Sequence, residues 1–405
     1  MEMIKRSLGP VVLSASSTFK CVLVSGPRQV GKTTLLKSIA ESGRRIVTLD
    51  DPMQRSLAKR DPALFLTANP APLLIDEVQY APELFPYIKM RVDESEETGL
   101  YWLTGSQPFH LMRGVSESLA GRVAVLSLQG LTEAEKSGVE NVPCLPSSDA
   151  VYGGSPKNRE EMAETVFRGS YPQLTARPET DVSLFMGSYV ATYLERDVRA
   201  LINVTHEHAF MVFLACLAAR TGQLLNAASL ASDVGVSATT IRSWISILES
   251  SGVIVLLRPY RCSLTKRATA MPKVYFADTG LASYLCGFRG PSEVERSPMW
   301  GHLFETWCVM AVLKSWWHSG LPCDAYFYRD RDGHEIDMLV RSGMRLYPFE
   351  MKSAETPDRG EIEANFSALT RTGVGLSDGA VVCLAKRNTP LSASLRCMNA
   401  AQIGM

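Results

Sequence analysis

Short, continuously apolar runs alternate with helix-like stretches in the first third of the chain. The apolar runs predict strands at residues 21–25, 46–49, 73–76, 100–104 and 123–128. A helical pattern follows the first strand, from residue 32 to about residue 42. Continuously apolar strands separated by helices are typical of a parallel sheet that is covered on both faces. We therefore expect an α/β domain in this part of the chain.

A mainly helical pattern covers residues 160–251, after a loop at 141–158 that is rich in Pro, Gly, Ser and Asn. Within it, a short helix at 229–234, a turn at Gly235 and a second helix at 238–249 form a compact helix-turn-helix pattern. Gly252 ends the second helix, as a glycine after a helix commonly does. Strands at 253–257 and 273–276 follow, and we interpret them as a wing.

A last α/β segment follows a second stretch rich in Pro, Gly and Ser, at residues 287–298. It begins with a helix at 303–317, and strands are expected near 325–328, 336–340 and 346–351. The second stretch therefore marks a domain boundary.

The composition is that of an ordinary globular protein, with 46% hydrophobic and 21% charged residues in 405. The 42 basic and 42 acidic residues balance, which excludes a highly basic coat-type nucleic-acid binder but not a local basic patch. No apolar run reaches the roughly 20 residues that a membrane helix needs, and the first residues do not resemble a cleaved signal peptide. The nine cysteines are scattered and contain no C-x-x-C pair. We expect a cytoplasmic protein with reduced thiols, no zinc site and no disulfide framework.

A glycine-containing loop between the first strand and the first helix fits G-x-x-x-x-G-K-[ST]. In that context the motif predicts a phosphate-binding loop, whose backbone N–H groups and helix amino terminus surround phosphate oxygens. Lys32 would reach the β- and γ-phosphates, and the Thr33 hydroxyl would coordinate Mg²⁺. The expected nucleotide-binding residues are Gly26, Pro27, Arg28, Gln29, Val30, Gly31, Lys32, Thr33 and Thr34.

The run Leu73-Leu74-Ile75-Asp76-Glu77 supplies the second half of this predicted site. The apolar residues of this strand put the Asp76 and Glu77 carboxylates at the carboxyl end of a buried strand, where ligands bind in such sheets. Asp76 would hold Mg²⁺ and Glu77 would orient the attacking water, the alternative being a helix-capping role. Thr104 or Ser106, after another strand, would sense the γ-phosphate or serve only in a turn.

The helix-turn-helix pattern also carries candidate nucleic-acid contacts. Its second helix presents small hydroxyl residues and one arginine on the face away from the apolar positions: Ser237, Thr239, Thr240, Arg242 and Ser243. Residues 253–277 contain five basic and no acidic residues before Asp278: Arg258, Arg261, Lys266, Arg267 and Lys273. This local basic patch favours DNA binding. A protein–protein module is the alternative.

Asp337 and the pair Glu350/Lys352, on two successive strands, have the D-x(n)-E-x-K arrangement of PD-(D/E)XK nucleases. Alternation along the second strand puts Glu350 and Lys352 on one face. Two carboxylates would bind Mg²⁺ or Mn²⁺ beside a scissile phosphate, and the lysine would orient water. Glu305, on the preceding helix, matches the acidic residue of the first core helix in those nucleases. We interpret His334, beside this predicted site, as a turn residue.

Taken together, the motifs resemble the AAA-type P-loop ATPases that carry a carboxy-terminal domain of the DUF4143 type. The similarity extends over stretches in almost the whole chain, including GPRQVGKTTLL, LLIDEVQYAPELFPYIK, LAGRV, YLERDVRALINV, PKVYFADTGLASYL and GHLFETWCV. The resemblance implies that Arg122, in the L-A-G-R segment, contacts phosphate in its own chain or across a subunit interface. Arg113 is a rival for this role, and a salt bridge is the alternative for Arg122.

The expected fold class is α/β, with an AAA-type P-loop domain, a winged helix-turn-helix and a restriction-endonuclease-like α/β domain. We place the P-loop domain at 1–140, a loop and helical connector at 141–205, the winged helix at 206–290 and the nuclease-like domain at 291–405. The leading hypothesis is Mg²⁺-dependent ATP hydrolysis that drives or gates action on DNA, with a metal-dependent nuclease domain. The alternatives are an ATP-dependent switch or scaffold whose inactive nuclease fold binds a partner, and a DNA-binding regulator. No membrane contact is expected, and a homo-oligomer is left open.

Overall fold

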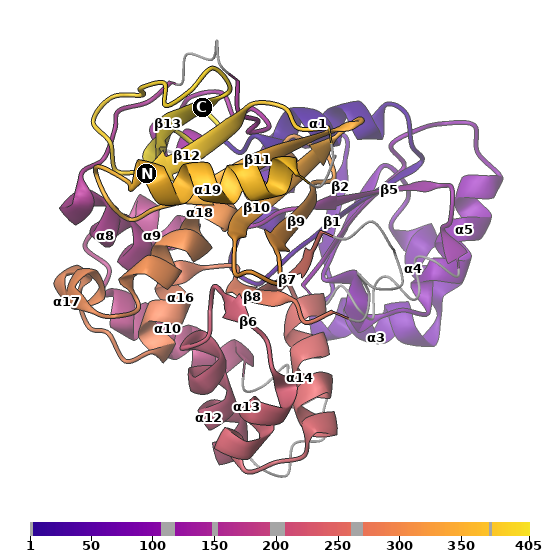
Figure 1. The fold of residues 1–405 in the computed structure, drawn as a ribbon. Coiled ribbons are helices and arrows are strands. Elements are labelled where there is room, and N and C mark those ends of the chain that lie inside the picture. The colour runs from indigo at the N-terminus through magenta and orange to yellow at the C-terminus, as the bar shows by residue number, and fades with distance from the viewer. Residues whose placement is uncertain (1–2, 107–117, 148–152, 195–206, 261–269, 372–374) are drawn as a thin grey trace.

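The computed structural model describes residues 3–106, 118–147, 153–194, 207–260, 270–371 and 375–405. These residues form two sheets, one of five strands and one of eight, with helices around and between them (Figure 1). Arg113, Arg261, Lys266 and Arg267 lie outside the described residues.

The first sheet is parallel in every pairing, as its apolar strands predict. Its order is β2-β3-β4-β1-β5, so the strand that leads into the P-loop lies between β4 and β5. The strands are β1 (Cys21–Ser25), β2 (Arg45–Thr48), β3 (Leu73–Asp76), β4 (Tyr101–Gly105) and β5 (Val123–Ser127). The helices that pack around it are α1 (Leu8–Ser16), α2 (Lys32–Ile39), α3 (Pro52–Arg60), α4 (Pro62–Ala68), η1 (Val78–Tyr80) and α5 (Leu84–Asp93).

Short helices follow the first sheet, in agreement with the helical pattern after residue 160. They are α7 (Glu133–Ser137), α8 (Arg159–Arg168), α9 (Pro172–Ala176), α10 (Val182–Tyr189) and the π-helical η2 (Val190–Leu194). The helix α8 begins at a capping box, in which the Asn158 side chain and Glu161 satisfy each other's backbone N–H groups.

The described residues of the next segment form three helices and three strands, and these strands pair with one another antiparallel. They are α12 (Glu207–Ala218), β6 (Gln223–Leu224), α13 (Ala227–Val234), α14 (Ala238–Ser250), β7 (Ile254–Pro259) and β8 (Lys273–Phe276). Gly235 has φ 77° and ends α13, which is the turn expected between the two helices. Ser237 caps α14 by accepting a hydrogen bond from the Thr240 N–H.

The last segment places a long helix against a mixed sheet. Its helices are α16 (Thr279–Leu285), α17 (Pro291–Arg296), α18 (Trp300–Trp317), α19 (Arg359–Thr370) and η3 (Ala400–Gln402). Its strands are β9 (Asp324–Arg329), β10 (Glu335–Ser342), β11 (Arg345–Met351), β12 (Gly379–Cys383) and β13 (Leu395–Asn399). The predicted boundary at 287–298 contains the helix α17, because Pro291 starts a helix as readily as it interrupts one.

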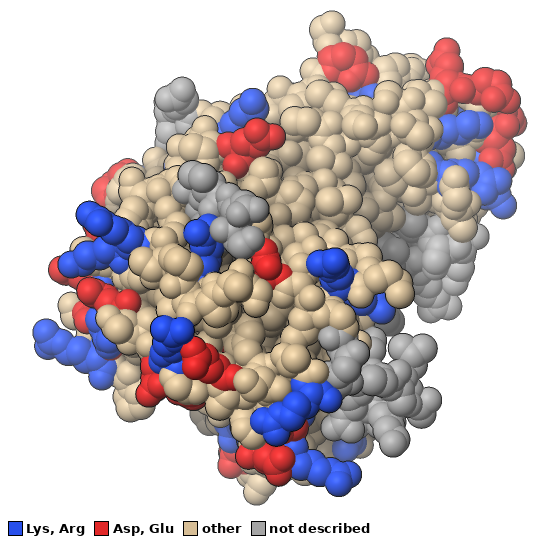
Figure 2. All heavy atoms as spheres, turned by 45° about the horizontal axis from the view of Figure 1, so that its top comes forward, with Lys and Arg blue, Asp and Glu red and all other residues tan. Residues whose placement is uncertain are grey.

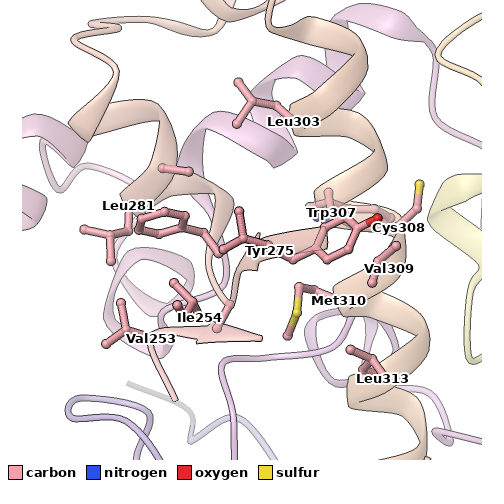
Figure 3. Close-up of a cluster of buried hydrophobic side chains, with 14 of the residues drawn as sticks. Val253, Ile254, Tyr275, Leu281, Leu303, Trp307, Cys308, Val309, Met310 and Leu313 are labelled. Atoms are coloured by element: carbon pink, nitrogen blue, oxygen red, sulfur yellow. The ribbon is translucent and has the colours of Figure 1, made fainter. Parts of the chain in front are cut away.

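The second sheet runs without a break from the β7–β8 hairpin into the last segment, in the order β13-β12-β11-β10-β9-β7-β8-β6. The link is the parallel pairing of β7 with β9, where Arg258 lies opposite Tyr326. Apolar side chains join the same parts: Ile254 and Tyr275 of the hairpin belong to the same buried cluster as Trp307 and Met310 of α18, and Figure 3 shows Tyr275 beside Trp307. The hairpin and the carboxy-terminal segment therefore share one sheet and one core.

Candidate functional site

The P-loop connects β1 to α2 and has the backbone that its glycines allow. Gly31, directly before α2, has φ 89°, a left-handed conformation that favours glycine. At Gly26 a Cβ atom would lie 1.9 Å from the Leu128 carbonyl oxygen, so only glycine fits between β1 and the end of β5. The loop therefore keeps the close backbone turn that a phosphate needs.

Lys32 is buried at the start of α2. Its Nζ atom donates to the carbonyl oxygens of Gly26 and Pro27, at 3.0 and 2.7 Å. Burial lowers the pKa of Lys32 to about 8, although the nearby Glu77 and Asp76 act in the opposite direction. The ammonium is thus held inside the loop, where a phosphate would become its partner.

Thr33, Asp76 and Thr104 meet at the carboxyl ends of the strands. The Thr33 hydroxyl donates to Asp76 Oδ1 at 2.6 Å, and the Thr104 hydroxyl donates to the same oxygen at 2.6 Å. A hydroxyl and a carboxylate at this spacing are hard oxygen ligands of the kind that Mg²⁺ takes beside a nucleotide. The donor set fits Mg²⁺.

Glu77 follows Asp76 in a left-handed conformation, with φ 57°. Its N–H donates to Thr104 Oγ1 at 3.1 Å, and its Oε2 accepts a hydrogen bond from the Ser106 hydroxyl at 2.9 Å. Gln79 also donates its Nε2–H to Glu77 Oε2, and the same amide lies 3.1 Å from Ser106 Oγ. Both polar residues expected at the end of this strand, Thr104 within β4 and Ser106 just after it, thus contact the acidic pair. Gln79 is a further contact that the sequence pattern did not reveal.

A cavity of about 640 Å³ opens beside the P-loop. It is bounded by α1, by α2 and by α9, with Leu13, Leu35, Ile39 and Pro172 among its apolar walls. Gly31 and Thr34 of the P-loop line the same space. No motif indicated this cavity, because its walls come from segments far apart in the sequence.

Arg6 holds the P-loop in place through its side chain. Its guanidinium donates to the carbonyl oxygens of Val30 at 2.6 Å and Gln129 at 2.7 Å, and its Nε lies 3.1 Å from Glu135 Oε1. Glu135 also lies 3.3 Å from Nδ1 of His318, which directly follows α18, while Nε2 of that ring accepts the Gln129 N–H. Burial would raise the pKa of Glu135, but His318 and Arg6 lower it well below its usual range. A buried ionic group thus connects the P-loop to the end of α18.

Arg122 lies at the other end of the first sheet. It precedes β5, its carbonyl oxygen accepts the N–H of Cys21 at the start of β1, and its guanidinium pairs with Asp93. The P-loop begins after Ser25, five strand residues away at about 3.3 Å each. Within one chain Arg122 therefore pairs with an aspartate and does not reach the P-loop, and its role toward a neighbouring subunit stays a prediction.

The four residues expected at the carboxy-terminal site lie close to one another. Asp337 and Glu350 are on the paired strands β10 and β11, and Asp337 Oδ2 accepts the N–H of Met351 at 2.8 Å. Lys352 lies 3.1 Å from Glu350 and 2.8 Å from Glu361. Burial and the nearby Asp337 raise the pKa of Glu350 to about 8, although Lys352 lowers it in part.

A lysine from outside the predicted motif lies among these acids. Lys273 of β8 has its Nζ 2.9 Å from Glu305, 2.5 Å from Glu335 and 3.6 Å from Asp337. We call Glu305, Glu335, Asp337 and Glu350 the carboxylate cluster. A divalent ion held by Glu305 and Asp337 would lie against this ammonium, so the residues as arranged do not fit the metal that a nuclease of this type needs.

The basic patch predicted for residues 253–277 loses one of its residues in the structure. Arg258 is exposed, but Lys273 is 4% exposed and paired with carboxylates, so its assignment to the patch was wrong. Burial of the whole strand caused the difference: every residue of β8 is buried, so a lysine in this strand cannot meet a ligand in solvent. On the face in Figure 2, Lys and Arg are interspersed with Asp and Glu among the described residues.

Three family matches cover most of the chain. Residues 18–136 match the AAA domain family, residues 159–292 match a domain of unknown function named DUF8612, and residues 300–403 match the domain of unknown function DUF4143. Among solved structures, the Walker-type ATPase Paby2304 of Pyrococcus abyssi is similar over 69% of this chain and 94% of its own, with 13% identity and a TM-score of 0.43. RuvB of Thermotoga maritima is similar over 62% of this chain and 85% of its own, with 18% identity and a TM-score of 0.28.

Two relatives align with this chain across the family matches. Uncharacterized proteins of Mycobacterium tuberculosis and Mycobacterium bovis are each 31% identical to this chain over 340 residues, which is 83% of this chain and 71% of each relative. No helix in the described part of the chain has the length and apolar character needed to cross a bilayer. The chain belongs to the same family as these mycobacterial proteins, and it carries an AAA domain followed by a carboxy-terminal DUF4143 domain.

Proposed function

We propose that the protein binds ATP with Mg²⁺ at the P-loop and hydrolyses it. The observation that carries this proposal is the convergence of Thr33, Asp76 and Glu77 beside Lys32 at the carboxyl ends of β1 and β3. Lys32 would bind the β- and γ-phosphates, while Thr33 and Asp76 would hold the metal ion. Glu77 would orient the attacking water, and Ser106 and Gln79 would position its carboxylate.

The cavity between α1, α2 and α9 supports a place for the base of the nucleotide. It adjoins Gly31 and Thr34, so a ligand with its phosphates in the loop can extend into it. Its walls are mainly apolar, which suits a flat heteroaromatic ring.

Hydrolysis should require a divalent metal. We expect phosphate release from ATP in the presence of Mg²⁺ and none above background with EDTA, because the charge on the γ-phosphate is then not neutralised. Thr33→Val should raise the Mg²⁺ concentration needed for half-maximal rate, whereas Thr67→Val, an exposed threonine on α4, should leave it unchanged. Equal rates with Mg²⁺ and with EDTA would show that the metal assignment is wrong.

We propose that the segment from α12 to β8 is a winged helix that contacts DNA. Its helix α14 exposes Thr239, Arg242 and Ser243, and its first hairpin strand exposes Arg258. Hydroxyl and guanidinium groups of this kind make contacts to phosphate oxygens.

Removing the basic charges of the wing should weaken DNA binding in a sequence-independent way. The variant neutralises Arg258, Arg261, Lys266 and Arg267, and we expect lower affinity for unrelated duplexes and a shallower dependence on salt, since fewer counterions are released. A matched variant removes four basic residues from α3 and α5: Lys59, Arg60, Lys89 and Arg91. An identical salt slope in the wing variant and the wild type would favour a protein-binding module.

A second candidate function is an ATP-dependent switch whose carboxy-terminal domain binds a partner without cutting nucleic acid. The ammonium of Lys273 within the carboxylate cluster favours it over metal-dependent cleavage. The nuclease hypothesis would require this lysine to leave the cluster.

A further inference from the structure

Two donors on one face of β8 converge on a single carboxylate. Side chains two residues apart in a strand project from the same face. Those of Lys273 and Tyr275 both project toward α18. The Lys273 Nζ atom lies 2.9 Å from Glu305 Oε1, and the Tyr275 hydroxyl donates to the same oxygen at 2.6 Å. Figure 3 shows Tyr275 beside Trp307 and Cys308 of α18. The contact between β8 and α18 is therefore ionic at Glu305 and apolar around it.

The backbone of β8 fixes where this ammonium lies. Lys273 pairs with Leu224 of β6 on one side and Leu257 of β7 on the other, and its side chain is 5% exposed. Because both edges of the strand are paired, the backbone fixes the face of the sheet from which this side chain projects. Lys273 is held in the cluster by the fold.

Two other acids of the cluster also have partners from the protein. Asp337 Oδ2 accepts the Met351 N–H at 2.8 Å, and Glu350 Oε1 lies 3.1 Å from Lys352. Glu350 Oε2 is buried and makes no hydrogen bond among the described residues.

We propose that Lys273 is the resident cation of the carboxylate cluster, and that it joins β8 to the carboxy-terminal domain in place of a divalent metal ion. Several acids this close together repel one another unless a cation lies between them. Here the ammonium supplies that positive charge from within the chain. The cluster is then an ionic junction between two parts of the fold and has no need of metal, whether or not the P-loop hydrolyses ATP.

Mn²⁺ titration of the full-length chain tests this proposal. All variants carry Asp76→Asn, so that the nucleotide site does not contribute its own ion. In the chain that keeps Lys273 we expect no saturable Mn²⁺ binding at the carboxylate cluster, that is, none that Asp337→Asn removes at millimolar concentration. Lys273→Met, which retains length and loses charge, should gain one bound Mn²⁺ per chain, and adding Asp337→Asn should remove it. Lys386→Met, at an exposed lysine, is the matched control.

Two results would overturn the proposal. The first is saturable Mn²⁺ binding by the chain with Lys273 that Asp337→Asn abolishes, a measurement that does not depend on whether the Lys273 variant folds. The second is a folded Lys273→Met chain that binds no more Mn²⁺ than its parent. Neither result bears on ATP hydrolysis, so failure of this proposal is distinguishable from failure of the proposed function.

Thermal unfolding gives an independent readout. Lys273→Met should lower the unfolding midpoint, because it leaves like charges buried together, and Lys273→Arg should lower it less. Adding Glu305→Gln to Lys273→Met should recover part of the loss, since one of the repelling charges is gone. A Lys273→Met chain that unfolds at the wild-type temperature would contradict the role of the ammonium in joining the two parts.

Discussion

Replacing Glu77 by glutamine is expected to leave ATP bound and to lower its turnover by at least about 100-fold, the lower end of what a general base contributes. The substitution removes the carboxylate that would orient water and leaves Lys32, Thr33 and Asp76 in place. Single-turnover measurements with labelled ATP would separate binding from hydrolysis.

Two further variants serve as comparisons for this experiment. Lys32→Ala should abolish binding itself, because it removes the ammonium that faces the phosphates. Glu83→Gln makes the same chemical change at an exposed glutamate just before α5 and should have no effect. Turnover by Glu77→Gln at the wild-type rate would mean that another group orients the water.

Replacing Glu135 by alanine should destabilise the protein by about 3–5 kcal/mol, the usual cost of leaving a buried charge without its partner. The Glu135 side chain is fully buried and accepts hydrogen bonds from the N–H groups of Ser7 and Thr132, besides its ionic contact with Arg6. The loss should appear as a lower midpoint of thermal unfolding. It should also weaken ATP binding, because Arg6 then no longer holds the Val30 carbonyl in position.

The double variant Arg6→Met, Glu135→Met is the decisive comparison. It removes both charges together, so part of the stability should return while ATP binding stays weak. Glu140→Ala, at an exposed glutamate just after α7, is the control. If Glu135→Ala unfolds at the wild-type temperature, the buried ionic group contributes little to stability.

The strands and the P-loop could be predicted from the sequence because their signals are local. The strand β8 was expected at residues 273–276 and is found there, and β3 ends at Asp76 as its apolar run predicts. A helix boundary differs from its expected position: α18 begins at Trp300, three residues before the expected start.

The contacts that connect distant segments could not be predicted in this way. Arg6 and Gln129 are 123 positions apart, and no periodic pattern links them. Lys273 appeared to belong to a basic patch because a list of charges along the chain does not show which strand residues face inward. The position of Arg122 could have been predicted. In a parallel sheet, a residue directly before one strand and a loop directly after the adjacent strand lie at opposite edges of the sheet.

The unbroken second sheet has a consequence for how the segments of this protein can recombine during evolution. The family boundaries at residues 292 and 300 divide the chain between β8 and β9, yet β7 and β9 are hydrogen-bonded neighbours. A gene fusion that joined the DUF4143 segment to an unrelated partner would leave the edge of β9 unpaired and the apolar side of α18 bare, which invites aggregation. Recombination during evolution is therefore expected to move the hairpin and the DUF4143 segment together.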